Sequence, residues 1–188
     1  MNRNFFYSVV FLSVVHFVNA QFEELSIAQQ VPMLVKVLSF DKNAQVEKKD
    51  YVIGILYQNT IAASEAAQQS IMQFHDTSQL ILSNGTIARF TTILIGPDDN
   101  WKTTAEEKKL SAVIVTPVDQ SLVREISRFC REQKIVSMTT VAEYVNEGLT
   151  LGIAKIKGKQ VILINLPGSL GEGVNFSSQV LRIAKVHR

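Results

Sequence analysis

The sequence predicts a single α/β domain with a mostly parallel sheet, helices on both faces, and a C-terminal antiparallel hairpin followed by a terminal helix. Three observations support this fold class. Short apolar runs alternate with amphipathic helical patterns along the chain, which is typical of parallel strands connected by helices. The run at residues 51–57 is apolar on both faces, as expected of an interior strand. Two β-rich runs, 150–156 and 160–165, flank a Lys-Gly-Lys link and therefore predict a hairpin.

The first twenty residues have the three-part pattern of a secretory signal peptide. Arg3 supplies a short positive start, residues 5–17 are apolar, and Ala20 ends a small-residue cleavage site. The apolar stretch is shorter than the roughly 20 residues that span a bilayer, so a retained anchor is the less favoured alternative. We expect cleavage between Ala20 and Gln21, export, and a mature domain of residues 21–188 that is not itself transmembrane.

The first half of the mature chain predicts two helices and two strands. Apolar residues at steps of three and four predict a helix over residues 25–40, which Pro32 would kink or delay. A second helix, over residues 61–74, is the expected crossover between the strand at 51–57 and the next strand at 87–95. The two strands should therefore be parallel.

The second half repeats the alternation of helix and strand. A capping-box pattern at residues 103–106 starts a short helix. Strands are predicted at residues 112–116 and 135–138, with an amphipathic helix over residues 119–132 between them. A second capping box at residues 140–143 starts the helix that precedes the hairpin.

Charge and cysteine content exclude several kinds of partner and bond. The chain carries 19 basic and 17 acidic residues, and the basic residues are scattered, so we expect no nucleic-acid binding. Cys130 is the single cysteine and therefore cannot form an internal disulfide. It falls on the apolar face of the helix over residues 119–132, where a thiol usually behaves as a small buried apolar group.

The sequence contains no recognisable catalytic or metal-binding set. His75 stands beside Asp76, but a hydrolase would need further groups gathered around it, and the chain has no Gly-x-Ser-x-Gly motif. His75 and His187 are the only histidines after residue 20, which is a thin supply of metal ligands. We therefore expect no enzyme, no cofactor and no bound metal.

Gly168, Gly171 and Gly173 precede the terminal helix. Their spacing fits neither the dinucleotide fingerprint nor a phosphate-binding P-loop, so a turn with a helix cap is the favoured interpretation. The alternative is an anion or ligand site at this turn. Asn165 ends the strand before the glycines, and its side chain is expected to bond the backbone of the turn.

A strand ending in Ile164-Asn165-Leu166, the glycine turn, and the run FSSQVLRIAKV at residues 176–186 form one C-terminal pattern. This pattern resembles the C-terminal signature of the YfiR-like family, a group of small bacterial periplasmic proteins. The resemblance is detailed over residues 135–186 and holds only in outline upstream. Many members end the first helix with a Phe-x-x-Trp-Pro-like motif, whereas residues 38–41 here read LSFD without a tryptophan.

The resemblance implies a periplasmic regulatory or adaptor protein that binds and restrains an inner-membrane signalling partner. In the best-understood branch of the family this partner is a diguanylate cyclase of cyclic-di-GMP signalling. A second copy of the chain, giving a homodimer, is the other partner considered. The alternative from a different class is a one-domain periplasmic solute-binding module, because α/β sheets bind ligands at the carboxyl ends of their strands.

Two residues are the predicted partner-binding anchors. Interfaces concentrate their energy in a few aromatic or apolar side chains. Trp101 stands in a polar loop after Gly96-Pro97, and Leu170 stands in the glycine turn, so neither lies on a stripe assigned to the core. For Trp101, a lid over the core is an equal alternative.

Overall fold

The structure is a computed structural model that describes most of the chain, namely residues 25–43, 51–82, 85–96 and 100–188. The predicted signal peptide and its cleavage site between Ala20 and Gln21 lie outside the described residues. None of the described helices is both long enough and apolar enough to cross a membrane.

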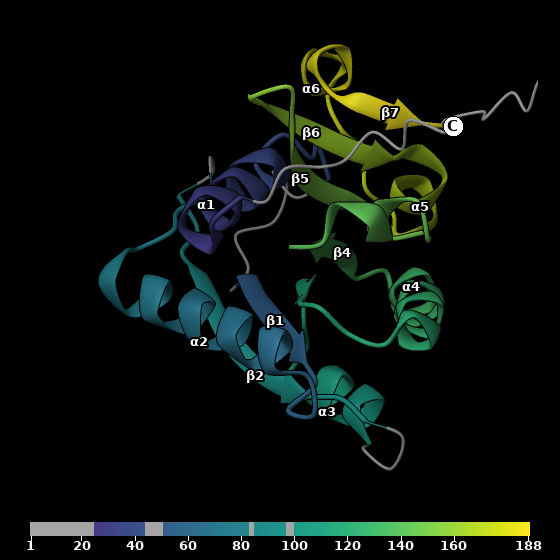
Figure 1. The fold of residues 1–188 in the computed structure, drawn as a ribbon. Coiled ribbons are helices and arrows are strands. Elements are labelled where there is room, and N and C mark those ends of the chain that lie inside the picture. The colour runs from purple at the N-terminus through teal and green to yellow at the C-terminus, as the bar shows by residue number, and fades with distance from the viewer. Residues whose placement is uncertain (1–24, 44–50, 83–84, 97–99) are drawn as a thin grey trace, which may run out of the picture.

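Seven strands form one sheet in the order β2-β1-β3-β4-β5-β6-β7 (Figure 1). The strands are β1 (Tyr51–Tyr57), β2 (Ala88–Leu94), β3 (Ala112–Val115), β4 (Val136–Thr139), β5 (Leu151–Ile156), β6 (Lys159–Asn165) and β7 (Lys185–His187). Every neighbouring pair is parallel except β5 and β6, which form the predicted antiparallel hairpin. The predicted fold class is confirmed.

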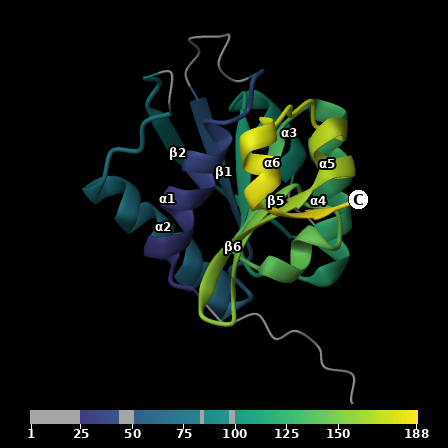
Figure 2. The same ribbon diagram turned by 90° about the horizontal axis from the view of Figure 1, so that it is seen from above.

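Helices cover both faces of this sheet. The helices are α1 (Ile27–Leu38), α2 (Ala62–Thr77), α3 (Trp101–Glu107), α4 (Gln120–Gln133), the 3-10 helix η1 (Ala142–Val145), α5 (Leu166–Gly171) and α6 (Ser178–Ile183). Seen from above, α1 and α2 lie on one side of the sheet and α3, α4 and α5 on the other (Figure 2).

The core consists of two main layers separated by the sheet. β3 shows the separation most clearly, because its residues alternate between the faces as the pleat requires. Ala112 and Ile114 pack into the layer under α1 and α2, whereas Val113 and Val115 pack into the layer under α3 and α4. A strand that is buried on both faces has to be apolar throughout, which is the pattern the sequence shows.

The strand order places a topological switch point between β1 and β3. From β1 the chain first crosses to β2 on one side and then returns to β3 on the other side. α2, which follows β1, lies on one face of the sheet, and α3, which precedes β3, lies on the opposite face. In open α/β sheets, the crevice outside the carboxyl ends of the strands near such a point is the usual ligand position.

The C-terminus contains an element that the sequence pattern does not predict. After α6 the chain becomes extended at Ala184, with φ −84° and ψ 152°. The next three residues form β7, which pairs in parallel with Leu163, Ile164 and Asn165 of β6. Because β7 covers this side of β6, the hairpin strand is an interior strand, as its apolar sequence predicts.

Candidate functional site

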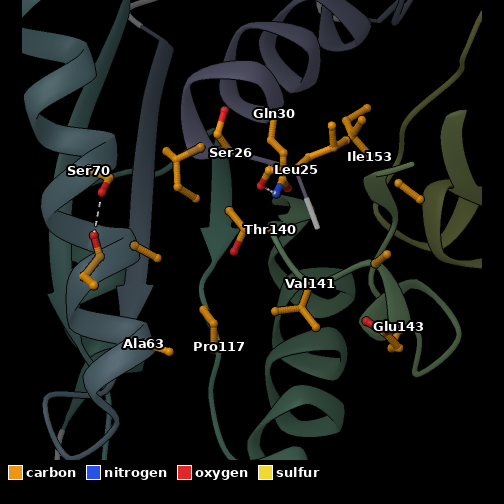
Figure 3. Close-up of a pocket in the computed structure, with 15 residues that line it drawn as sticks. Leu25, Ser26, Gln30, Ala63, Ser70, Pro117, Thr140, Val141, Glu143 and Ile153 are labelled. Atoms are coloured by element: carbon orange, nitrogen blue, oxygen red, sulfur yellow. Dashed lines mark hydrogen bonds between the residues drawn. The ribbon is translucent and has the colours of Figure 1, made fainter. Parts of the chain in front are cut away.

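A cleft of about 850 Å³ lies beside the carboxyl ends of β3 and β4 (Figure 3). Its walls come from the start of α1, the first half of α2, the loops after β3 and β4, η1, and the middle of β5. It therefore occupies the side of the sheet where doubly wound folds bind their ligands. Its volume is also within the range of roughly 300–1,000 Å³ that is usual for small-molecule sites.

Small side chains on α2 make room for the cleft. Ala63, Ala66 and Ala67 are spaced so that they share one face of the helix, and all three border the cleft. Ser70 continues this face one turn later, but its hydroxyl donates a hydrogen bond to the Ala66 carbonyl at 2.8 Å. The α2 wall therefore offers an apolar surface with little hydrogen-bonding capacity of its own.

The loop after β4 is held in place by a buried hydroxyl. Thr139 Oγ1 donates to the Val115 carbonyl at 3.1 Å and accepts from the Val141 N–H at 2.9 Å. The Thr140 N–H also donates to the Val115 carbonyl at 3.1 Å. The end of β3 thus fixes the loop that brings Thr140 and Val141 to the border of the cleft.

Two polar atoms of residues that border the cleft have no hydrogen-bond partner among the described residues. Gln30 is only 4% exposed, and its Nε2 donates to the Leu25 carbonyl at 2.8 Å, but its Oε1 is unpaired. Thr140 Oγ1 is likewise shielded from solvent and unpaired. A buried polar atom left without a partner costs about 1–3 kcal/mol, so both are exceptions that call for a cause.

The switch point itself is filled by a network of paired side chains. Gln58 accepts from the Asp119 N–H at 2.6 Å and donates to Asp119 Oδ2 at 2.9 Å. The buried hydroxyls of Ser64 and Thr116 lie 2.6 Å apart and share a hydrogen bond. Each of these groups has its hydrogen-bond partner inside the protein, and the network supports the loop after β3. The open space lies beside this network, in the cleft.

Tyr144 links the two loops that flank the cleft. Its hydroxyl donates to the Val118 carbonyl at 2.6 Å and accepts from the Val118 N–H at 3.0 Å. Burial raises the pKa of this hydroxyl, so it stays protonated and keeps its donor role at physiological pH. The loop after β3 and the helix η1 are therefore held together as one wall.

Trp101 is not the exposed anchor that the sequence predicts. It is the first residue of α3, is only 4% exposed, and packs edge-on against Phe129 with ring centroids 4.9 Å apart. The sequence does not reveal this burial, because the residues before Trp101 are polar and the predicted helix start is the capping box at residues 103–106. In the structure, α3 begins at Trp101. Trp101 and Ala105 lie four residues apart and point to the same core, a spacing that indicates a buried helix face.

Leu170 lies on the surface as predicted, with 67% of its area exposed on α5. Neither Leu170 nor the three glycines of the turn borders the cleft. Whether Leu170 binds a partner stays a prediction.

The glycines have local structural roles. The Gly168 N–H donates to Asn165 Oδ1 at 2.8 Å, and Asn165 Nδ2 donates to the Val145 carbonyl at 2.9 Å. A side chain at Gly171 would lie 3.1 Å from the Arg131 side chain, and Gly173 has a φ of +81°. These contacts agree with the turn-and-cap interpretation, while the anion-site alternative stays a prediction.

The hydrolase alternative would require catalytic groups gathered around His75. The His75 ring lies 4.9 Å from the Phe90 ring, and its Nδ1 has no hydrogen-bond partner among the described residues. Within residues 25–43, 51–82, 85–96 and 100–188, no group of three or more His, Cys, Asp and Glu side chains is placed to bind a metal ion.

A second polar cluster surrounds Glu172, and it contains none of the predicted site residues. This residue follows α5 and is 2% exposed. Burial raises the pKa of its carboxyl to about 7, and the neighbouring Ser137, Thr150 and Arg131 act in the opposite direction. The cluster could not be found from the sequence, because Glu172 has the surroundings of an ordinary surface turn there.

Comparisons with known proteins inform the fold. No model of a known protein family matches the sequence, and no curated protein matches it. The YfiR-like resemblance therefore stays a prediction.

Several solved structures are similar in fold. A substrate-binding protein with adhesive properties from Clostridium difficile, in a ligand-free, open form, matches with a TM-score of 0.55 and 13% identity over 74% of this chain and 55% of that one. The ABC domain in complex with L-Trp from Streptococcus pneumoniae matches with a TM-score of 0.58 and 14% identity over 85% and 59%. A conserved domain protein from Vibrio cholerae O1 biovar El Tor matches with a TM-score of 0.61 and 15% identity over 88% and 62%.

At these identities the likeness shows the fold alone. The chain spans less than two thirds of the length of each of these three structures.

Proposed function

We propose that this chain is a solute-binding module that holds a small molecule in the cleft beside β3 and β4. The observation that carries the proposal is the cleft itself, an open space of about 850 Å³ at the carboxyl ends of parallel strands. The alanines of α2 border this space, and the paired side chains at the neighbouring switch point support the loop after β3, which supplies Pro117 to the wall of the cleft. Preformed, mostly apolar walls with few polar groups are typical of such sites.

The fold comparisons support the same class. One structural neighbour is described as a substrate-binding protein, and another is a domain in complex with L-Trp. Solute binding is therefore a role that this fold performs in other proteins, although fold alone does not assign a function. The alternative raised by the sequence thus has more support than the regulatory interpretation.

A thermal-shift assay with a panel of metabolites tests the proposal. A ligand that binds only the folded protein raises the melting temperature by mass action. Ala66→Trp should abolish the shift, because Ala66 is exposed in the wall of the cleft and the indole would fill the space. Ala62→Trp is the matched control, since Ala62 is exposed on the same helix but does not border the cleft. A shift that survives Ala66→Trp would contradict the proposed position.

We also propose, as a second function, that the chain is a regulatory or adaptor protein of the periplasm. The observation that favours it is the exposure of two large apolar side chains, Leu170 at 67% and Ile183 at 68%, in the segment that carries the YfiR-like resemblance. Leu170→Ala should weaken capture of the periplasmic part of a diguanylate cyclase. Ile81→Ala, which removes an exposed apolar side chain outside that segment, should not weaken it. Equal capture by both variants would argue against Leu170 as an anchor.

A further inference from the structure

We propose that the protein forms a symmetric dimer in which β2 of one copy pairs antiparallel with β2 of a second copy. β2 is the last strand at one end of the sheet, and β7 is the last strand at the other end (Figure 1). No residue of β2 borders the cleft, so the proposal goes beyond solute binding and does not depend on it. Its grounds are the backbone groups on the outer side of β2, their symmetric placement, and the charges and side chains of the strand.

Two hydrogen bonds show which backbone groups of β2 point away from β1. The Ile95 N–H donates to the Tyr57 carbonyl of β1 at 2.9 Å. The Ala88 N–H donates to the Leu80 carbonyl at 2.9 Å, and Leu80 lies on the other side of the strand. Successive residues of a strand direct their backbone groups to alternate sides. The odd-numbered residues of β2 therefore face β1, and the even-numbered residues face outward.

The free edge of β2 consists of Phe90, Thr92 and Leu94. Their outward N–H and C=O groups have no partner among the described residues. Leu80 already occupies the outer side at Ala88, so the free edge begins at Phe90. Backbone donors and acceptors in this regular spacing match those of another extended strand. The chemistry of the edge therefore selects a strand as the protein partner.

This free edge is complementary to itself. In an antiparallel pair centred on Thr92, each Thr92 lies opposite Thr92 of the second copy, and each Phe90 lies opposite Leu94 of the second copy. All three residues of each copy then form hydrogen-bonded pairs, which exchange both N–H···O bonds. Such an interface uses the same surface on both subunits, as two-fold symmetric dimers do. A second copy thus satisfies every free backbone group of the edge.

The charges of β2 permit this pairing. Residues 90–94 read FTTIL and contain no charge and no proline, and β2 follows β1 through seven consecutive pairs without a bulge. Charged residues, prolines and bulges are the usual means by which a protein keeps a free edge from pairing with another strand. Arg89 is the one charged residue of β2. The antiparallel arrangement places the two Arg89 side chains at opposite ends of the shared edge, so they do not repel each other.

The side chains opposite each other also fit together. Phe90 packs only partly into the core under α1 and α2, and Thr92 and Leu94 are likewise partly exposed. The proposed register places an aromatic ring beside an aliphatic side chain at both ends of the edge, and two threonines beside each other at its centre. Cross-strand contacts of aromatic side chains and Thr–Thr pairs stabilise antiparallel strands. The interface therefore buries apolar surface as well as pairing the backbones.

Light scattering during size-exclusion chromatography tests the proposal on the purified protein. At roughly 0.1 mM, where a dimer with a micromolar dissociation constant is almost completely formed, the wild type should have twice the mass of one chain. Thr92→Pro should be a folded monomer by circular dichroism and light scattering, because proline removes an outward N–H and an edge strand tolerates it. Thr92→Val keeps this N–H and is the matched control, which should stay dimeric.

Two outcomes of this experiment would overturn the proposal. A monomeric wild type would do so, and this is the result expected if the edge instead takes a strand from a different protein. A dimeric Thr92→Pro would show that the two copies meet at another surface.

A charge exchange at Thr92 tests the antiparallel register. Thr92→Lys and Thr92→Glu each place like charges opposite each other, so each should raise the dissociation constant of the dimer about threefold or more. An equal mixture of the two variants should form heterodimers more readily than either variant forms homodimers. Both variants keep the backbone N–H, so this test holds even if Thr92→Pro does not fold. A mixture that is no more dimeric than its components would overturn the proposed pairing.

Discussion

Glu172 and Ser137 join the end of α5 to β4 through two hydrogen bonds. The Ser137 N–H donates to Glu172 Oε2 at 2.9 Å, and the Ser137 hydroxyl donates to Oε1 at 2.5 Å. The same hydroxyl accepts from the Thr150 N–H at 2.9 Å, so the carboxyl is connected to the start of β5 as well. A titratable group thus stands at a junction of three elements in the interior.

This junction should make stability depend on pH. Burial raises the Glu172 pKa from 4.5 to about 7, so the folded protein binds its proton more tightly than the unfolded chain does. The resulting stabilisation is complete below about pH 4.5 and is lost as the pH rises through 7. Glu172→Gln stays neutral and should become more stable than the wild type by up to about 3 kcal/mol between pH 5 and pH 8.

Urea unfolding at several pH values measures the effect. The difference in unfolding free energy between Glu172→Gln and the wild type should grow from pH 5 to about pH 7 and level off above pH 7. A difference that does not change with pH would show that the Glu172 proton is not linked to folding.

Trp101→Ala should destabilise the protein strongly. The indole is buried against Phe129, and large-to-small changes of aromatic core residues cost about 3–5 kcal/mol. Leu170→Ala removes an exposed side chain and should change the unfolding free energy by about 0.5 kcal/mol or less. Chemical denaturation of both variants compares a buried with an exposed position, and a loss of less than about 1 kcal/mol for Trp101→Ala would place its side chain outside the core.

Cys130 should be unreactive in the native protein. It is fully buried on α4, and burial raises the pKa of its thiol, which leaves little of the nucleophilic thiolate. Labelling by a thiol reagent should therefore be slow and should speed up when urea unfolds the chain. Cys130→Ala should cost only about 1–2 kcal/mol. Rapid native labelling, or a covalent dimer without reductant, would contradict this expectation.

Export with cleavage after Ala20 is a separate prediction from the sequence. The first twenty residues carry the positive, apolar and small-residue parts of a signal peptide. When the full chain is expressed in a Gram-negative host, the intact mass of the periplasmic fraction should correspond to a protein that begins at Gln21. A full-length species held in the membrane fraction would show that the segment is retained as an anchor.

The strands were the most predictable part of the fold. β1 matches its predicted range of 51–57, because an interior strand is apolar on both faces and its pattern does not depend on distant residues. The sequence does not predict β7, because three residues are too few to show a periodicity. They form a strand because they pair with the edge of β6 that β5 does not occupy. Trp101 was misplaced for a related reason, since its burial depends on where α4 lies.

The cleft could not be predicted in detail from the sequence. The expectation that a ligand would bind at the carboxyl ends of the strands follows from topology alone, and it names the side of the sheet on which the cleft lies. The alanines of α2 have the same sequence pattern whether they pack against a neighbour or border an open space. Likewise, the sequence around Gln30 is that of an ordinary helix, and it does not show that the side-chain oxygen Oε1 lacks a hydrogen-bond donor among the described residues.

The pairing between β4 and β5 has a consequence for motion in the sheet. These strands share two residue pairs, Met138 with Leu151 and Thr139 with Gly152, whereas β1 and β2 share seven. The β4–β5 pairing is therefore the shortest seam between neighbouring strands in the parallel part of the sheet. It lies next to the cleft, which is bordered by Thr140 after β4 and by Ile153 on β5. Few hydrogen bonds have to break for this seam to open locally, so its amide protons should exchange with solvent sooner than those of β1. A molecule that contacts both sides of the seam would slow this exchange by bracing the two strands against each other.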